Sequence, residues 1–505
     1  MPVLRKSLYV YVTSLLSIFL AASFASAGSS VNVPVESGVY DDLERLEVKG
    51  LLDTALLSTR PFGGLEAARL IREAEEKEAS STKDGQPIIS RLESQFKDVL
   101  ENPGANYVQP IDTFYMRSVY SSDGNPYFLN VNNNGDRLTG GGNLRIGLAS
   151  SAGVFDTFSF YLNPEYRLDE SGDRGALVLG YMTVDLFGAT LELGRDSMWW
   201  GPGYHGDLLL TNNAQPFDMI KLTSQHPFLL PWIFKYIGLI KPTIFLTHID
   251  KDMNYPRANI LGMRLDFKPT DHLEIGLSRL FLNGGHGRQA LTLSDWAQLF
   301  IASNSAEHSG GPIDGSQMAS VDASYVYVNT RRWIPLSGIK VYTEWGFIDS
   351  PGLAIIPTGR GDLEGAFIDE PFYLENIDLR IEWANTAHNA RYGPLWYSSS
   401  FYSTGWRYLG NIIGHHMGPD AKDLYGRVQY HYMEKITVGV ESDWERNGFH
   451  TGTPGEKIWA GTDVSYNPTD NMTLMVGAGF QDIKVFNTVP NSGAVLQAQA
   501  MYYFR

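Results

Sequence analysis

The alternation of apolar and polar residues along most of the chain is the feature that most limits how it can fold. Ile377–Trp383 and Leu261–Phe267 place an apolar side chain at every second position, with charged or small side chains between them. The same alternation reaches the C terminus at Leu496, Ala498, Ala500, Tyr502 and Phe504. A period of two is typical of β-strands whose two faces meet different environments. We therefore predict an all-β structure for residues 106–505.

The number of such segments indicates the architecture. We count about eighteen strands, with centres near residues 115, 144, 162, 180, 192, 220, 244, 263, 276, 325, 343, 380, 398, 428, 440, 461, 477 and 500. A soluble sandwich would turn the polar face of each strand to bulk water, whereas an outer-membrane barrel turns it to the lumen. The alternation fits both. The even strand number and the aromatic C-terminal strand favour an antiparallel transmembrane β-barrel.

Composition excludes several other classes. The 505 residues carry 40 basic and 56 acidic side chains, and this acidic balance argues against nucleic-acid binding. The absence of cysteine excludes a disulfide-stapled protein. The mean hydropathy of −0.18 argues against a helical membrane protein, but a barrel that alternates apolar and polar residues keeps such a modest value.

The first residues resemble an export signal. Arg5 and Lys6 precede an apolar run from Leu8 to Phe24, and Ala25-Ser26-Ala27 has the small residues of a cleavage site. This pattern predicts a signal peptide over residues 1–27. The alternative is an N-terminal membrane anchor, which the Ala-x-Ala ending disfavours.

Residues 28–105 follow a different period. Val39, Leu43 and Leu46 recur at intervals of three and four, and similar stripes run through residues 65–71 and 88–99. This spacing predicts three short amphipathic helices that form a small bundle. We expect the bundle in the periplasm, where it either docks a partner or plugs the barrel.

The connections between predicted strands alternate in length. They are short near residues 269, 434 and 468, after even strands, and long after strands five, nine and thirteen. With both chain ends in the periplasm, the long connections are expected at the cell exterior or folded back from there into the lumen.

One long connection carries a distinctive motif. Gly194 to Phe217 reads GRDSMWWGPGYHGDLLLTNNAQPF. A second, weaker pattern comprises Gly405, Tyr408, Gly410, Ile413, Gly414, His415, Gly418 and Asp420. Together with Gly50-Leu51-Leu52 and Arg60-Pro61 near the N terminus, these motifs resemble the capsule assembly protein Wzi family. The resemblance implies an outer-membrane barrel with a small periplasmic helical bundle, which helps retain capsular polysaccharide and has no known catalytic activity.

The motif contains residue types that suit glycan recognition. Aromatic rings stack on sugar faces, amides hydrogen-bond hydroxyl groups, and arginine pairs bidentately with a uronate carboxylate. The candidate residues for polysaccharide binding, or for a loop inside the lumen, are Arg195, Trp199, Trp200, Tyr204, His205, Asn212, Asn213, His415 and Asp420. The alternative is that the glycines and proline shape a tight loop whose aromatic rings pack inside the barrel mouth.

Other motifs point to no catalysis or cofactor. Gly201, Gly203 and Gly206 satisfy G-x-G-x-x-G, but Pro202 interrupts the motif and no βαβ unit is expected. His415 and His416 lie near Asp420, but the spacing fixes no third metal ligand. The chain has no H-E-x-x-H and no G-x-S-x-G. Paired carboxylates on alternating strands are explained by lumen charges facing Arg264, Arg380 and Arg427.

We therefore predict a non-enzymatic protein, without cofactor or metal, that binds or anchors capsular polysaccharide or exopolysaccharide at the cell surface. The expected partners are that polysaccharide, outer-membrane lipid and periplasmic components of the capsule export machinery, but no nucleic acid. The competing hypotheses are a porin-like diffusion or export channel and, less favoured, an outer-membrane hydrolase.

Overall fold

The computed structural model describes residues 28–80, 85–249, 253–300, 313–329, 334–348, 359–388, 396–486 and 491–504. The predicted signal peptide, residues 1–27, lies outside the described residues. Within the described ranges, no helix has the length and apolar character needed to cross a bilayer.

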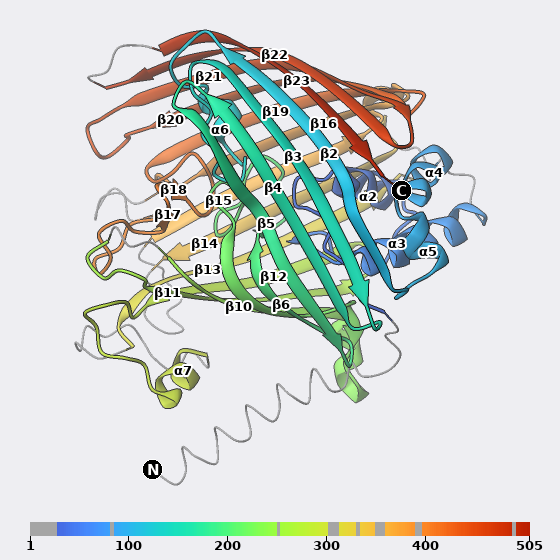
Figure 1. Ribbon diagram of the computed structural model, residues 1–505, viewed down its shortest axis with the longest axis horizontal. Coiled ribbons are helices and arrows are strands. Elements are labelled where there is room, and N and C mark those ends of the chain that lie inside the picture. The colour runs from blue at the N-terminus through green and yellow to red at the C-terminus, as the bar shows by residue number, and fades with distance from the viewer. Residues whose placement is uncertain are drawn as a thin grey trace.

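Eighteen long strands of the described residues form a closed antiparallel barrel (Figure 1). They are β2 (Tyr107–Ser121), β3 (Gly141–Val154), β4 (Phe158–Asp169), β5 (Gly172–Leu186), β6 (Ala189–Asp196), β8 (Phe217–Ser224), β10 (Leu239–His248), β11 (Asn259–Thr270), β12 (Leu273–Asn283), β13 (Gly315–Val328), β14 (Gly338–Ile348), β15 (Gly359–Asp369), β16 (Ile377–Asn385), β19 (Ala421–Tyr432), β20 (Ile436–Asn447), β21 (Gly455–Thr469), β22 (Met472–Val485) and β23 (Asn491–Tyr503). The first and last strands close the barrel, with Thr113 opposite Tyr503 and Ser121 opposite Val495.

Shorter elements lie between these strands or before them. They are β1 (Thr59–Arg60), β7 (Trp199–Trp200), β9 (Phe228–Leu229), β17 (Arg407–Tyr408), β18 (Asn411–Ile412), the helices α6 (Tyr127–Asn130) and α7 (Leu293–Phe300), and the 3₁₀ turns η1 (Trp232–Ile237) and η2 (Pro371–Tyr373).

The predicted strand count is confirmed, but one strand was misplaced. Residue 398 lies in a loop, so the strand expected there was wrong, and β15 was missed. In β15 most lumen-facing positions are glycine or apolar, with Leu363 and Phe367 buried, whereas Arg360 and Glu364 are exposed. This reverses the usual pattern of a barrel strand and hides it from a search for polar lumen faces. The two errors cancel, so the numbering of later strands is unchanged.

The two faces of the wall differ as the alternation predicts. On β16, the side chains of Asp378, Arg380 and Glu382 are buried toward the lumen, while Ile381 on the opposite face is exposed. A closed barrel pairs every strand edge, which satisfies the backbone hydrogen bonds that lipid cannot. The apolar outer face is what contact with lipid requires.

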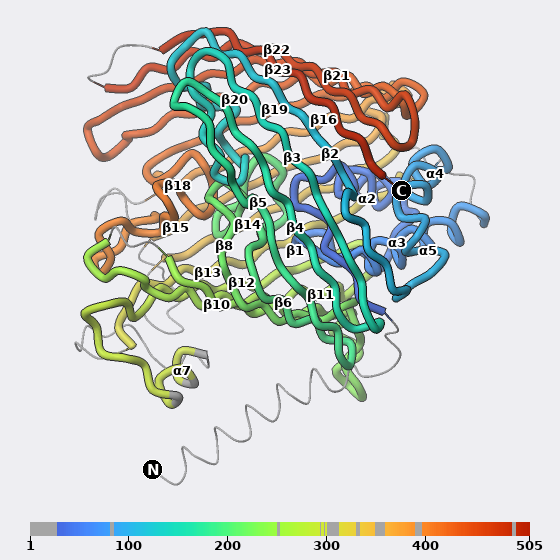
Figure 2. The backbone as a smooth tube through the Cα atoms, viewed as in Figure 1, coloured from blue at the N-terminus to red at the C-terminus, as the bar shows by residue number. Residues whose placement is uncertain are grey.

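Among the described residues, four helices precede the barrel and cluster at the end near the C terminus (Figure 2). They are α2 (Val39–Val48), α3 (Gly64–Glu78), α4 (Gln86–Gln95) and α5 (Lys97–Glu101), so the third predicted stripe divides into two helices. Leu43, Leu46, Leu70, Ile71, Ile88 and Leu92 belong to their common core. We call residues 28–101 the bundle. The turn after α2 depends on Gly50, whose φ of +73° directs the following Leu51 N–H to the Leu46 carbonyl at 2.9 Å.

The barrel therefore has two different ends. The short-turn end, with residues 433–435, contacts the bundle, since Arg45 on α2 forms an ion pair with Glu434 at 2.8 Å. The long-loop end carries the connections that follow β2, β6, β12 and β16. The connection after β12 packs on the outer wall, where Leu299 and Trp296 contact a cluster with Leu261 and Phe281. Within the described part of this connection, α7 therefore lies on the outer face of the wall.

Candidate functional site in the barrel lumen

Three loops from the long-loop end fold into the lumen, and together we call residues 122–140, 197–216 and 396–420 the plug. The second and third loops share one apolar core with the barrel wall. Its buried members from these two loops are Met198, Trp200, Leu208, Leu209, Leu210, Ala214, Trp396, Tyr397, Tyr402, Trp406, Ile412, Ile413 and Met417. Wall residues such as Phe245 on β10, Leu280 on β12 and Leu363 on β15 complete the core.

Carboxylates of the wall hold the second loop by its backbone. The Glu382 carboxylate accepts hydrogen bonds from the N–H groups of Tyr204, His205 and Gly206 at 2.8, 3.0 and 3.1 Å. Glu344 on β14 accepts the Leu208 N–H at 2.7 Å. Hydrogen bonds to ionised acceptors are stronger than neutral ones, so the loop backbone has a fixed position. The sequence suggested a pairing of Glu382 with arginines, and this use of the carboxylate was missed.

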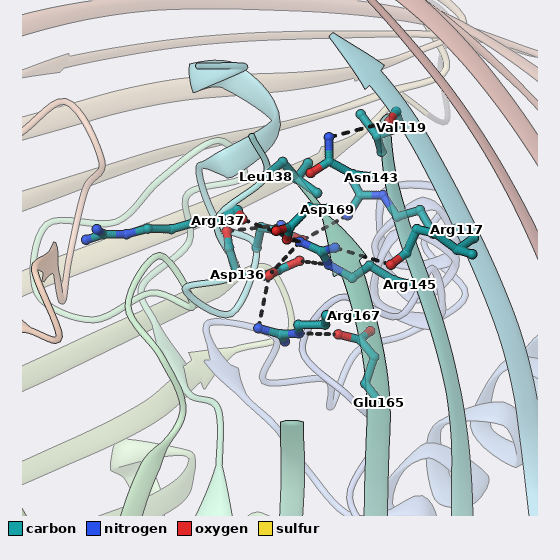
Figure 3. Close-up of polar contacts among 12 residues, drawn as sticks. Arg117, Val119, Asp136, Arg137, Leu138, Asn143, Arg145, Glu165, Arg167 and Asp169 are labelled. Carbon is teal, nitrogen blue, oxygen red and sulfur yellow. Dashed lines mark hydrogen bonds and ion pairs between the residues drawn. The ribbon is translucent and has the colours of Figure 1, made fainter. Parts of the chain in front are cut away.

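The first plug loop is held by an ionic network instead. Asp136 lies between two arginines of the wall, 2.8 Å from Arg145 on β3 and 2.9 Å from Arg167 on β4 (Figure 3). Arg145 also contacts Asp169 at 3.1 Å, and Arg167 contacts Glu165 at 2.6 Å. These paired charges lie in the lumen, where an isolated charge would be costly.

The two tryptophans of the motif are enclosed. Trp199 is 4% exposed and Trp200 is fully buried. As strand β7 they pair with β1 of the bundle, Trp200 opposite Thr59 and Trp199 opposite Arg60. Trp200 also meets Phe245 edge-on at 5.2 Å between ring centroids. Both rings are therefore enclosed by protein, and the bundle and plug meet at this point.

Tyr204 and His205 follow the two tryptophans in the same loop and contact the barrel wall. The Arg380 guanidinium lies 4.1 Å from the centre of the Tyr204 ring. His205 stacks on Tyr425 with 4.0 Å between centroids. Its Nε2 lies 2.6 Å from Asp443 on β20. Burial lowers the pKa of the His205 imidazole.

The two asparagines connect the loops of the plug to one another. The Asn212 carbonyl accepts the Asn134 N–H at 2.9 Å. The Asn213 side-chain amide donates to the Ile412 carbonyl at 2.9 Å, and its oxygen accepts the Asn132 N–H at 3.3 Å. The Asn212 backbone and the Asn213 side chain therefore connect loops from three separate parts of the chain.

The remaining candidates do not join a single site. Arg195 has the parity of the outward-facing residues of β6 and pairs bidentately with Asp218 at 2.8 Å. Asp420 binds His450 at 2.7 Å and accepts backbone N–H groups of the loop after β20. His415 is buried, and its N–H donates to the Tyr397 hydroxyl at 2.7 Å. Asp420 and His415 therefore have different hydrogen-bond partners.

The glycines of G-x-G-x-x-G serve the plug. A Cβ on Gly206 would collide with the His415 ring, and the described segment that follows, residues 207–216, is not helical. The dinucleotide pattern requires a helix there. Close packing therefore explains the glycines, against the third loop at Gly206 and against Asp207 of the same loop at Gly201 and Gly203.

A cavity of about 1350 Å³, lined by both polar and apolar side chains, also lies in the lumen. Its lining comes from the bundle, the first plug loop and the lumen face of β2–β4 and β19–β23, including Arg117, Gln429, Asp463, Gln497 and Tyr503. The sequence predicted polar lumen positions on these strands but gave no indication of how much of the lumen the plug would leave open.

A closed eighteen-stranded barrel with an apolar outer face and charged lumen residues defines an integral outer-membrane protein. A sequence model of the capsule assembly protein Wzi family matches residues 117–498. The chain belongs to this family.

Individual relatives are more distant. The chain is similar to Escherichia coli Wzi, described as a carbohydrate-binding β-barrel involved in group 1 capsule assembly, with a TM-score of 0.70 and 17% identity, covering 94% of this chain and 99% of that structure. An uncharacterized 55.8 kDa protein in the cps region of Klebsiella pneumoniae is 23% identical over 335 residues. That match covers 62% of this chain, which spans 58% of the length of the relative. Pseudomonas aeruginosa OprD gives a TM-score of 0.46 at 10% identity, over 78% of this chain and 95% of that one.

Proposed function

We propose that this protein binds capsular polysaccharide or exopolysaccharide at the cell surface and assists capsule assembly without catalysing a reaction. Family membership and the carbohydrate binding described for E. coli Wzi support this function. The observation that carries it is the plug, because its apolar core joins the second and third loops to the wall as a rigid platform. The long-loop end then faces the exterior and the bundle faces the periplasm, where it is available to the export machinery.

Deletion of the gene tests the proposal. We expect polysaccharide synthesis to continue while a larger share of the polymer appears in the medium, and we expect the wild-type gene to restore the cell-bound share. Unchanged cell-bound polysaccharide in the deletion strain would contradict the function. Loss of total polymer would point to synthesis or export instead.

The glycan contacts are proposed at the rim of the long-loop end, not on the buried tryptophans. Phe449 is 38% exposed, and the Lys422 ammonium and Arg446 guanidinium lie 4.8 and 5.5 Å from its ring centre. An aromatic face beside two cations suits a sugar ring that carries a carboxylate. Such local cations offset an overall net charge of −16.

A second group of the same kind surrounds Arg288. Its guanidinium lies 5.4 Å from the ring centres of both Tyr255 and Phe401. The predicted motif residues support these contacts indirectly. Asp420 holds the loop that carries Phe449, and Arg195 holds β6 against β8 through its ion pair with Asp218. The residues that order the plug are Trp199, Trp200, Tyr204, His205, Asn212, Asn213 and His415.

The channel hypothesis predicts an open lumen. Opening a path here requires displacement of the plug from its core with the wall and from Glu382 and Glu344. We expect purified protein in a planar bilayer to show no large steady conductance. Steady openings with the wild-type chain would favour the porin-like alternative.

The outer face of the barrel wall supports the proposal that outer-membrane lipid is a partner. Exposed apolar side chains on this face include Leu162, Ile220, Val321, Trp345, Ile381, Val440, Val476 and Leu496. Such an apolar surface in water would favour association, whereas lipid covers it without cost.

A further inference from the structure

Four potential metal ligands meet where the plug contacts the wall. His205 comes from the second plug loop, His416 from the third, Asp423 from β19 and Asp443 from β20. One ligand atom from each of these residues lies within 4.8 Å of all the others. We call these residues the two-histidine cluster. It includes one predicted candidate, His205, and three residues outside the predicted set.

The distances resemble those between ligands of one ion. His205 Nε2 lies 2.6 Å from Asp443 Oδ2, and His416 Nε2 lies 3.1 Å from Asp423 Oδ2 and 3.9 Å from Asp443 Oδ2. Zinc binds imidazole nitrogen and carboxylate oxygen at about 2.0–2.2 Å, which separates tetrahedral ligands by roughly 3.3–3.6 Å. The observed separations bracket this range.

Unsatisfied atoms provide an independent observation. Among the described residues, His416 Nδ1 and Nε2, Asp423 Oδ2 and Asp443 Oδ1 are buried and make no hydrogen bond. The His416 side chain is 1% exposed, so water does not readily replace the missing partners. Its nitrogen is close to two carboxylates, but neither contact has the alignment of a hydrogen bond. An ion in the cluster would supply the partner that these buried atoms lack.

The local charge also matches a divalent cation. Glu445 lies 3.2 Å from His416 Nε2 and forms an ion pair with Lys457. With both imidazoles neutral, Asp423, Asp443 and Glu445 carry three negative charges against one positive charge on Lys457. Two uncompensated negative charges in a buried site are costly. A divalent ion would neutralise them.

We propose that the two-histidine cluster binds one divalent transition-metal ion, with zinc the best-suited one. Imidazole ligands favour zinc and its neighbours over magnesium or calcium, which prefer oxygen-only sites. The bound ion cross-links two plug loops to two adjacent wall strands. This proposal concerns the internal fastening of the plug and stands independently of glycan binding.

The test uses the full-length protein, purified without a histidine tag and treated with EDTA. Titration with zinc chloride should reach one zinc per chain, and EDTA should lower the thermal stability of the zinc-loaded protein. His416→Gln should weaken zinc binding by more than about tenfold. The matched control is His431→Gln, because His431 contacts Asp378 at 2.7 Å outside the cluster and its replacement should leave zinc binding unchanged.

Absence of stoichiometric zinc in the wild-type protein, or equal binding by His416→Gln, would overturn the proposal in favour of a hydrogen-bonded network without an ion. Zinc K-edge absorption of the wild-type protein gives a reading that needs no variant. Two imidazole ligands support the site, and fewer than two contradict it.

Discussion

The bundle and the plug both lie against the lumen wall, but different interactions hold them. The bundle has its own apolar core and meets the wall mainly through ion pairs, such as Arg45 with Glu434 and Lys268 with Glu47 at 2.8 Å each. The second and third plug loops share their apolar core with the wall. The bundle is therefore expected to fold as a unit that docks, whereas the plug depends on the barrel for its structure.

The largest effect is expected when a central residue is removed from the apolar core that the plug shares with the wall. Trp200→Ala should cost about 3–5 kcal/mol of plug stability, because a fully buried indole is lost. Limited proteolysis should then cut within residues 197–216 while the barrel stays folded. Trp232→Ala is the control, since Trp232 is 87% exposed, and it should leave the pattern unchanged. Equal sensitivity of both variants would mean that the plug has no shared core.

The reciprocal experiment removes a residue from the bundle core. Leu43→Ala should cost about 2–5 kcal/mol, and the loss should be confined to the bundle. Hydrogen exchange should rise in α2–α4 but not in the plug or the wall. If barrel strands exchange equally fast, the bundle does not fold as a separate unit.

A smaller effect is expected from the carboxylate that holds the second loop. Glu382→Gln keeps one carbonyl oxygen but loses the charge and an acceptor, which should cost about 1–3 kcal/mol. Glu364→Gln is the matched control on an exposed position of β15. Proteolytic susceptibility of residues 204–208 measures the difference, and an unchanged loop in Glu382→Gln would show that packing alone holds it.

The smallest predicted effect is a pH dependence of bundle docking. Burial alone would raise the pKa of Glu434, but the hydrogen bond and charge of Arg45, helped by Arg91, lower it to about 2 from an ordinary value of 4.5. A lowered pKa means that this contribution is complete above about pH 4.5 and is lost as the pH falls toward 2. Protease access to the bundle should rise in that window, and Glu434→Gln should remove this part of the response.

The sequence predicted the strands of the barrel wall better than the contacts inside the lumen. A strand repeats its environment every two residues, so lipid and lumen faces leave a local pattern. Only β15 escaped, because its lumen-facing Leu363 packs in the core shared with the plug and its Phe367 packs with Val48 of the bundle. Contacts inside the lumen have no such pattern. His205 and Asp443 meet although 238 residues separate them, and Trp200 pairs with a strand of the bundle. Each depends on closure of the whole barrel, which no local spacing encodes.

The proposal that this protein binds capsular polysaccharide without cleaving it is tested most directly by mixing the native host's purified polysaccharide with the wild-type protein in detergent. We expect saturable binding without shortening of the polymer. We also expect weaker binding by a Lys422→Gln, Phe449→Ala variant whose plug remains resistant to proteolysis. An absence of binding by the folded wild-type protein, or shortened polymer chains, would contradict it.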